Sequence, residues 1–521
     1  MKLSLHLRSS LCIAMFACTA ASCAKKEQGT VPPKSSKKDL VAFIFNKESN
    51  PSLPQAIDCE IKGDTIYAVA FAGTNITRMK AGFATTGAKV TVNGELQVTE
   101  QMVHDFSTPI KYIVEAEDGS EKTYTVKFSD TKLPVLYIST NNIAIDSKEV
   151  YIPGSIIIKS NLSGDSLYGG DMQIRGRGNS TWDMPKKPYK IKLNKKSGLL
   201  GMNQSKQWVL LANYADKSLV RNEVGFELSR RLGLAYTVAG RFVDVVLNGA
   251  YVGNYELAEQ IEVGSTKVNV QEQPQGGTAL PDISGGYLTE IDGFYMSEPV
   301  YFISNRGMPV TIHYPKDDEI NDAQKSYITQ YYNMFEDSLF SENFADPVNG
   351  YQKYFDLKSF VNWYLVNEII GNPDTFWSTY MYKNYNDDKL YTGPVWDLDI
   401  AANNDIRLGD VVNKMMLDVA YEPRIWVNRL IQDKAVRNAI RDRWNEVKAN
   451  VNSIPSYVDQ LAAQLAYSQK KNFQTWNILS EFVYLNIQAA GSYDGEVAYL
   501  KGYLARRVAW LDTQFNSGRF D

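Results

Sequence analysis

Histidine is scarce in this chain of 521 residues, which contains only His6, His104 and His313. These residues stand far apart in the sequence and none lies in an HExxH or similar spacing, so nothing indicates a zinc site. A Ser-His-Asp hydrolase would also need a GxSxG nucleophile elbow, which the sequence lacks. Any chemistry must therefore rest on carboxylates, lysines and arginines.

Cysteine is also scarce, with four residues in total. Cys12, Cys18 and Cys23 belong to the N-terminal segment considered next, so only Cys59 remains for the folded part. A single thiol excludes an internal disulfide framework. The hydrophobic fraction of 44% provides a core that needs no covalent cross-links.

Long hydrophobic runs are absent too. The apolar run Leu11–Ala21 spans about eleven residues, whereas a membrane-spanning helix needs about 20. With Lys2 and Arg8 before it, this run is typical of the hydrophobic region of a signal peptide. The small residues 20–22 lead into Cys23 as in a relaxed lipobox, which predicts that Cys23 is acylated and anchors the chain. Ordinary secretion with cleavage near this point is the alternative.

Charge of one sign is not in excess, since 55 Lys and Arg face 59 Asp and Glu. No basic block indicates nucleic acid as a partner. At roughly 150 residues per domain, the length predicts two to four domains. We divide the chain into a lipoprotein signal peptide, a flexible tether, a β-rich domain and a large C-terminal domain, with bounds 1–23, 24–38, 39–129 and 130–521.

The segment 39–129 shows short alternating strands. Residues 90–92 alternate in polarity, Asn93-Gly94 supplies a tight turn, and the alternation then resumes. A second turn at Asp118-Gly119 joins residues 112–116 to 124–128. This pattern predicts a small β-sandwich of immunoglobulin-like architecture. We expect it to act as a spacer, with ligand binding as the alternative.

The C-terminal segment 130–521 begins strand-rich and ends helical, so the chain as a whole is predicted to be α+β. In its last hundred residues, Val436, Ile440, Trp444 and Val447 recur at helical spacing, which indicates an amphipathic helix against a core.

The segment QIRGRGNSTWDMPKKPYKIKL combines a glycine turn with a basic strand. A GxG alone is weak, but arginines beside it can pair bidentately with phosphate oxygens. The two lysines alternate with apolar residues and should share one strand face. A glycine turn followed by a strand lysine is how protein kinases hold ATP. The proposed nucleotide-binding residues here are Arg175, Arg177, Lys190 and Lys192; a solvated basic strand is the alternative.

A helix follows in the segment KSLVRNEVGFELSRRLGL. Ser218 is the expected N-cap residue, and Glu223 and Glu227 share one face, one turn apart. In a kinase a helix glutamate pairs with the strand lysine, so both are candidates for the nucleotide site. Solvated helix charges are the alternative.

Three aspartates flank a predicted hairpin. Asp356 caps a helix that stops near Gly371, and Asp374 follows. A strand, a turn and a returning strand then lead to Asp397 and Asp399. Because an antiparallel hairpin brings its open ends together, Asp374 and Asp397 should converge.

Converging carboxylates without histidine suit Mg²⁺, which prefers oxygen ligands. Protein kinases place a base aspartate before such a hairpin and a metal-binding aspartate after it. A Ca²⁺ loop at DLDIAANND fails the EF-hand pattern because Ala401 stands at a ligand position. A purely structural capping role for the aspartates is the remaining alternative.

The motifs RGRGNSTW, KKPYKIKL, LLANYADKSLVRNEVG, LNGAYVGNYELAEQI, GGYLTEID and GPVWDLD, in this order, resemble those of the spore-coat-protein-H (CotH) kinase family. The resemblance covers roughly residues 130–520. It implies an atypical protein-kinase-like fold and Mg²⁺-dependent transfer of the ATP γ-phosphate to protein Ser or Thr. Asp374 matches the catalytic aspartate of the family and Asp397 its metal ligand. The asparagine expected four or five residues after Asp374 is replaced by Ser378 and Thr379, so Asp399 is the candidate second ligand.

Three functions follow as hypotheses. The first is an extracytoplasmic protein kinase, lipid-anchored in the cell envelope at the outer membrane. Because little ATP is found there, a repurposed kinase fold that acts as a surface-binding lipoprotein is the second. The third, a carbohydrate-linked envelope component, rests only on the aromatic content of 12%.

Overall fold

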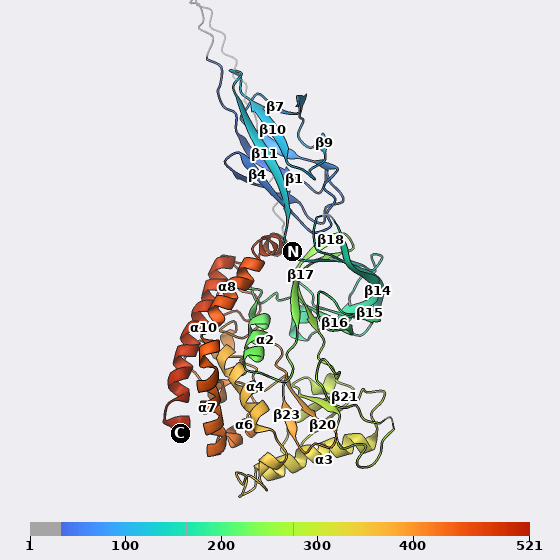
Figure 1. Ribbon diagram of the computed structural model, residues 1–521, viewed down its shortest axis with the longest axis vertical. Helices are drawn as coiled ribbons and strands as arrows, with labels where there is room; N and C mark the ends of the chain where they lie inside the picture. The colour runs from blue at the N-terminus through green and yellow to red at the C-terminus, as the bar shows by residue number, and fades with distance from the viewer. Residues whose placement is uncertain (1–32, 163, 275, 521) are drawn as a thin grey trace, which may run out of the picture.

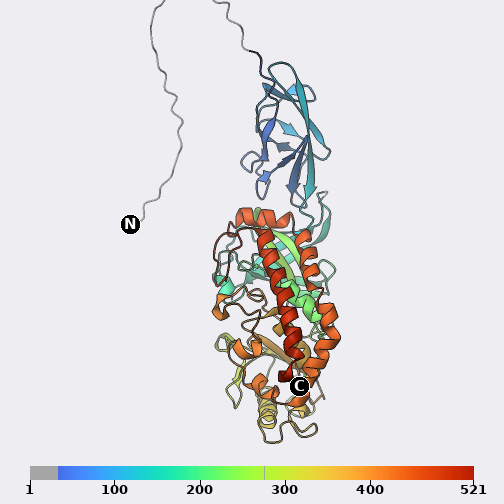
Figure 2. The same cartoon turned by 90° about the vertical axis from the view of Figure 1, so that its left-hand side faces the viewer.

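The computed structural model describes residues 33–520, apart from residues 163 and 275. The predicted signal peptide, the acylation site Cys23 and most of the tether lie outside the described residues. The molecule is elongated, with a β-rich module at one end, a barrel in the middle and a second sheet with a long helix at the other end (Figure 1). Helices form a layer along one side of the barrel and the second sheet (Figure 2). This mixture of helices and strands confirms the α+β class.

The first module contains a three-stranded sheet in the order β2-β1-β6 and a six-stranded sheet in the order β3-β4-β11-β10-β7-β8. β4 and β11 pair in parallel. Inward-facing residues of both sheets, among them Phe45, Ile66 and Val114, form a hydrophobic cluster of their own. The strands are β1 (Leu40–Phe45), β2 (Ile57–Asp58), β3 (Glu60–Lys62), β4 (Thr65–Ala70), β5 (Met79–Lys80), β6 (Gly82–Thr85), β7 (Lys89–Val92), β8 (Glu95–Leu96), β9 (Val103–His104), β10 (Ile110–Glu115) and β11 (Glu121–Asp130).

Both predicted hairpins of this module are confirmed. β7 pairs with β8 from Val92↔Glu95 outward. The turn residues Asn93 (φ 50°) and Gly94 (φ 84°) both adopt the left-handed conformation that a type I′ turn requires. β10 pairs with β11, and Gly119 lies in the connecting turn.

A closed barrel follows, in the order β12-β13-β14-β15-β16-β18-β17. Along β15 the residues Tyr189, Ile191 and Leu193 are buried in the barrel, whereas Lys190 and Lys192 point outward from one face, as their alternation predicts. The strands are β12 (Val135–Ser139), β13 (Ile152–Lys159), β14 (Ser166–Gly176), β15 (Tyr189–Ser197), β16 (Ser205–Leu211), β17 (Gly240–Leu247) and β18 (Ala250–Glu259).

The second sheet has five strands in the order β20-β21-β19-β22-β23. It packs with the helical layer around the largest hydrophobic cluster of the chain. The strands are β19 (Tyr287–Ile291), β20 (Tyr301–Ile303), β21 (Pro309–Tyr314), β22 (Thr379–Lys383) and β23 (Leu390–Thr392). The helices of the chain are α1 (Ser180–Asp183), α2 (Arg221–Arg231), α3 (Asp322–Leu339), α4 (Leu357–Ile370), α5 (Met416–Val419), α6 (Ile425–Leu430), α7 (Lys434–Val451), α8 (Ile454–Gln464), α9 (Ser468–Thr475) and α10 (Tyr493–Phe515).

Two predicted helices are confirmed. α4 begins after Asp356, whose Oδ1 accepts a hydrogen bond from the Ser359 amide at 2.7 Å. It ends at Gly371, which has φ 61° and closes the helix in the left-handed conformation. α7 buries the predicted apolar stripe, including Trp444, against the core.

The predicted N-cap of α2 is wrong. The helix begins at Arg221 with Val220 at the N-cap position, and no side chain caps it there. Ser218 instead donates its hydroxyl to Asp216 Oδ1 at 2.6 Å, while Asp216 Oδ2 accepts the Arg221 amide at 2.8 Å. The carboxylate of Asp216 therefore satisfies the helix start from five residues upstream, where local spacing gives no signal.

The β-rich module is packed against the barrel and α9. The ring of Phe71 stacks on Tyr251 of β18 with centroids 4.3 Å apart. Tyr137 donates its hydroxyl to the Ala72 carbonyl at 2.7 Å. Lys471 of α9 donates to the Ala56 carbonyl at 3.2 Å. These contacts hold the module in a defined position on the barrel.

Candidate functional site

The hairpin β22–β23 brings Asp374 and Asp397 toward each other. Asp374 lies in the turn after α4, where the Asn372 side chain accepts its amide at 3.1 Å. Asp397 follows β23, the partner strand of β22. The two carboxylates are close enough that the charge of Asp374 contributes to raising the pKa of Asp397. The convergence expected from the hairpin is therefore present.

Asp397 and Asp399 carry carboxylates that are costly to ionise. Asp397 is solvent-exposed, yet it is recessed among enough protein atoms that desolvation raises its pKa to about 6. Asp399 is 9% exposed, and burial followed by the charge of Asp397 raises its pKa to about 7. No side chain among the described residues donates a hydrogen bond to either carboxylate. A bound cation would stabilise the ionised form of both carboxylates.

Arg177 faces these aspartates from the barrel. It follows β14, and its guanidinium lies 5.6 Å from the ring centroid of Trp396, the residue before Asp397. Burial lowers the pKa of Arg177, and the charge of Asp397 is the largest influence that opposes this shift. Arg177 thus places a positive charge opposite the carboxylates.

Lys190 and Arg175 lie on the barrel side of the same region. Burial lowers the pKa of Lys190 to about 8, and the charges of Arg175 and Arg177 add to the shift. The guanidinium of Arg175 lies over the ring of Tyr151 at 5.1 Å and 3.8 Å from Glu149. Lys190 and Arg177 are therefore neighbours in space, as an anion site requires.

The other three predicted nucleotide-binding residues are not brought to this group. Lys192 is exposed on the barrel surface. Glu223 pairs with Arg230 and accepts the Tyr457 hydroxyl at 2.7 Å. Glu227 pairs with Arg230 and Arg231 of its own helix, both at 2.8 Å. The helix glutamates thus have arginine partners one or two turns away, and the carboxylates whose charges act on Lys190 are Glu262 and Glu298.

Asp374 has a partner of its own. Arg407 donates to Asp374 Oδ2 at 3.1 Å and to Asp405 Oδ2 at 2.8 Å, and its guanidinium lies over the Tyr421 ring at 5.0 Å. Burial raises the pKa of Asp374, and Arg407 opposes this shift. The contact with Arg407 orients the Asp374 carboxylate and shares its charge.

The asparagine expected four or five residues after Asp374 as a second metal ligand is absent, and Ser378 and Thr379 stand there. Thr379 is buried and directs its hydroxyl to the Thr375 carbonyl at 3.3 Å. Within the described ranges, no three His, Cys, Asp or Glu side chains are placed to hold a metal ion by themselves. A metal at Asp397 and Asp399 would therefore need further oxygen ligands of another kind, such as water or a bound phosphate.

Glu290, His313 and Tyr380 form a cluster that the sequence reasoning missed. His313 Nε2 lies 2.6 Å from Glu290 Oε2, and the imidazole stacks on Tyr380 with centroids 5.5 Å apart. The charge of Glu290 acts on both Arg177 and Asp397, which places the cluster beside the aspartates. The motif GGYLTEID contains Glu290, but its cross-strand neighbours His313 and Tyr380 carry no local signal.

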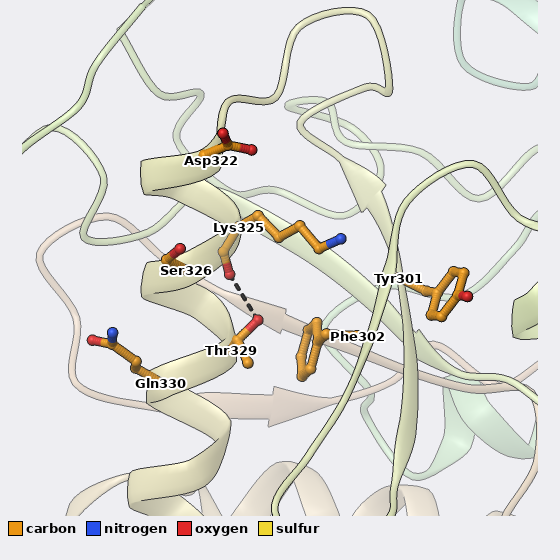
Figure 3. A pocket seen from close by; sticks show the side chains of 7 residues that line it. All are labelled: Tyr301, Phe302, Asp322, Lys325, Ser326, Thr329 and Gln330. Atoms are coloured by element: carbon orange, nitrogen blue, oxygen red, sulfur yellow. Dashed lines mark hydrogen bonds between the residues drawn. The ribbon is translucent and has the colours of Figure 1, made fainter.

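A shallow pocket of about 420 Å³ lies elsewhere, between β20 and α3 (Figure 3). Its helix side is polar, and the Thr329 hydroxyl is turned back to the Lys325 carbonyl at 2.8 Å. None of the predicted site residues lines it. The pocket is therefore separate from the carboxylate group.

Comparisons with known proteins agree with the motif analysis. Residues 174–511, more than half of the chain, match the family model described as CotH kinase protein. Residues 48–128 match a model described as SGBP, N-terminal. No curated protein matches the chain.

A crystal structure of a candidate glycoside hydrolase from Bacteroides thetaiotaomicron is similar at 16% identity, with a TM-score of 0.15. The match covers 42% of this chain and 55% of that one, so the chain spans about half the length of that protein. So low a TM-score supports no conclusion about fold or activity.

The His313–Glu290 pair predicts a pH-dependent stability. Burial alone would lower the pKa of His313, but the hydrogen bond and charge of Glu290 outweigh it and raise the pKa above its ordinary value; Glu298 and Asp292 also face the imidazole. The pair therefore stabilises the fold fully below about pH 6.5, and this contribution is lost as pH rises through the raised pKa. His313→Gln should cost roughly 1 kcal/mol of unfolding free energy at pH 6 and less at pH 9.

Urea unfolding of His313→Gln and wild type at these two pH values measures the difference. His104→Gln is the matched control, because burial lowers the pKa of His104 and its protonation disfavours the fold. A cost of His313→Gln that is the same at pH 6 and pH 9 would show that the imidazole is not charged in the folded state.

Proposed function

We propose, from the premise that this chain belongs to the CotH kinase protein family, that it is a metal-dependent protein kinase. It would transfer the γ-phosphate of ATP to a Ser or Thr hydroxyl of a protein substrate. The observation that carries the proposal is the convergence of Asp374 and Asp397 opposite Arg177, with Lys190 beside it. Acidic and basic side chains thus meet between the barrel and the second sheet.

The fold assignment that goes with this function is an atypical protein-kinase-like domain preceded by an immunoglobulin-like β-sandwich. The order of parts supports it: a glycine turn, a strand lysine, a helix, and a hairpin flanked by aspartates. One part differs, because Glu223 and Glu227 pair with arginines and leave Lys190 without a helix partner.

The residues present fit a magnesium ion. Asp397 and Asp399 offer carboxylate oxygens that no side chain of the described ranges satisfies. Mg²⁺ is commonly held by one or two carboxylates together with substrate phosphates, which agrees with a pair of aspartates that no third His, Cys, Asp or Glu of the described residues joins. When bound there, the ion would neutralise charge on the phosphate oxygens.

Side chains of the protein would bind the phosphates and accept the proton. Arg177 and Lys190 would bind phosphate oxygens through charge-assisted hydrogen bonds. An anion beside Lys190 would favour its charged form and counteract the lowered pKa. Asp374 would orient the acceptor hydroxyl and take its proton while the hydroxyl oxygen bonds to the γ-phosphorus and the bond to ADP breaks.

We further propose that the protein is displayed on the cell envelope, anchored through Cys23. Among residues 33–520, without 163 and 275, no helix is long and apolar enough to cross a membrane. The proposal rests on the N-terminal sequence.

A surface-binding lipoprotein built on the same fold is the second candidate. Two observations favour it. Asp374 is engaged by Arg407, and Thr379 stands where a second metal-binding side chain is expected. ATP is also scarce outside the cytoplasm.

Asp397 and Asp374 should fail in different ways when substituted. Asp397→Ala should weaken metal-dependent ATP binding, whereas Asp374→Asn should leave binding nearly intact and lower turnover about 10²–10⁴-fold. Purified residues 24–521 are incubated with labelled ATP and Mg²⁺ or Mn²⁺, and both autophosphorylation and transfer to a generic protein acceptor are read. EDTA should abolish both. Absence of nucleotide binding and of transfer with either metal would replace the kinase by the surface-binding function.

Lys190 and Lys192 provide a matched pair on one strand face. Lys190→Met should weaken ATP binding about tenfold or more, because a charge-assisted contact to phosphate is lost. Lys192→Met removes the same charge two residues away, on the exposed barrel surface, and should change binding little. Equal losses in the two variants, measured by equilibrium dialysis, would mean that only the general basic character of the strand matters.

Acylation of Cys23 is checked by labelling cells with an alkynyl fatty acid. Wild type should incorporate the label and Cys23→Ser should not. Equal labelling of the two would mean that the chain is secreted without this anchor.

A further inference from the structure

The loop that carries the proposed metal ligands has an unusual backbone. Asp397 has φ 63°, and Ala402 and Asn403 have φ 53° and 55°. L-residues adopt this left-handed region uncommonly, and each costs free energy that surrounding contacts must supply. The loop 397–403 is therefore held by its neighbours rather than by its own preferences.

Asn222 of α2 contacts the backbone between the two carboxylates. Its Oδ1 accepts the backbone amide of Leu398, the residue between Asp397 and Asp399, at 2.9 Å. Its Nδ2 donates to Asn213 Oδ1 at 3.1 Å. Asn222 is only 5% exposed, so both bonds are shielded from water. Hydrogen bonds thus hold both the oxygen and the nitrogen of the Asn222 side chain.

α2 and the loop are also in close van der Waals contact. A Cβ added to Gly225 would lie 2.1 Å from Leu398 Cδ1, so any larger residue there would force the buried Leu398 side chain to move. One turn earlier, Arg221 Nε donates to the Ala401 carbonyl at 3.0 Å. Arg221 is held in turn by a buried ion pair with Asp216. The first turns of α2 and the loop therefore behave as one packed unit.

We infer that Asn222 is a positioning residue that sets the relative direction of the Asp397 and Asp399 carboxylates for a bound divalent cation. The inference rests on the proposed function. The hydrogen bond to the Leu398 amide fixes the Asp397–Leu398 peptide plane, one of the two planes between the aspartates, and so restricts how far their side chains diverge. Residues that orient metal ligands without touching the metal commonly change its affinity 10- to 100-fold.

The alternative is that Asn222 only satisfies buried polar groups. In that case, replacing Asn222 would lower stability. Its effect on metal binding would be no larger than that of replacing another buried asparagine. Asn362 of α4 is such an amide: it is 3% exposed, and its Oδ1 accepts Arg443 Nε at 2.9 Å. Asn362→Ala therefore serves as the matched control.

The test uses residues 24–521 and needs no turnover. Binding of labelled ATP is measured by equilibrium dialysis across a range of Mn²⁺ concentrations. Asn222→Ala should raise the Mn²⁺ concentration for half-maximal binding at least tenfold, and Asn362→Ala should leave it within about twofold. Asn222→Asp retains an acceptor for the Leu398 amide and should bind at lower Mn²⁺ than Asn222→Ala.

A second readout is independent of metal. Hydrogen exchange of the segment 397–402 in the metal-free protein should be faster in Asn222→Ala than in wild type and unchanged in Asn362→Ala. Unchanged exchange, an unchanged Mn²⁺ requirement, or equal losses in the alanine and aspartate variants would each overturn the inference while the proposed function stands. If wild type binds no ATP at any Mn²⁺ concentration, the proposed function falls and this role of Asn222 falls with it.

Discussion

Uncompensated negative charge between the barrel and the second sheet is the constraint on which the arrangement of the site depends. Desolvation raises the pKa values of Asp397 and Asp399; the charges of Asp374 and Glu290 add to the shift of Asp397, and the charge of Asp397 adds to that of Asp399. The guanidinium of Arg177 is the positive group whose charge acts on both of them. Keeping such carboxylates close together costs stability, and groups with perturbed pKa values of this kind are frequent at functional sites, which agrees with the proposed cation site.

The scaffold divides the two signs of charge between its parts. The barrel contributes Arg177 and Lys190 from neighbouring strands, whereas the second sheet and its hairpin contribute the carboxylates. α2 joins the parts, since its Asn222 donates to Asn213, shortly after the barrel strand β16, and accepts the Leu398 amide of the Asp397–Asp399 loop. The distance between opposite charges is therefore set by packing between elements and not by the local sequence.

Asp374 illustrates how one geometry agrees with two functions. Its contact with Arg407 orients the carboxylate, which suits a residue that aligns an acceptor hydroxyl. The same contact shares its charge, which suits a fold that binds without turnover. The cluster of Glu290 and His313 adds a further charged pair, whose glutamate acts on Asp397.

The sequence by itself determined the α+β class, the two β-hairpins of the first module, the helix from Asp356 to Gly371 and the face shared by Lys190 and Lys192. Each of these depends on spacing or turn chemistry within about twenty residues, where pattern and structure are directly coupled. The hairpin that brings Asp374 to Asp397 is also local, and the motif series identified the family.

Only the tertiary structure decided which charges meet. Glu223 and Glu227 had the spacing of partners for a strand lysine. Glu227 pairs with Arg230 and Arg231 at helical spacing, which the sequence can show, whereas Glu223 also accepts the hydroxyl of Tyr457 in α8, 234 positions away. Asn222 contacts Leu398 across 176 positions. Contacts of this kind depend on how separate elements pack, and periodicity within one element contains no information about its neighbour's side chains.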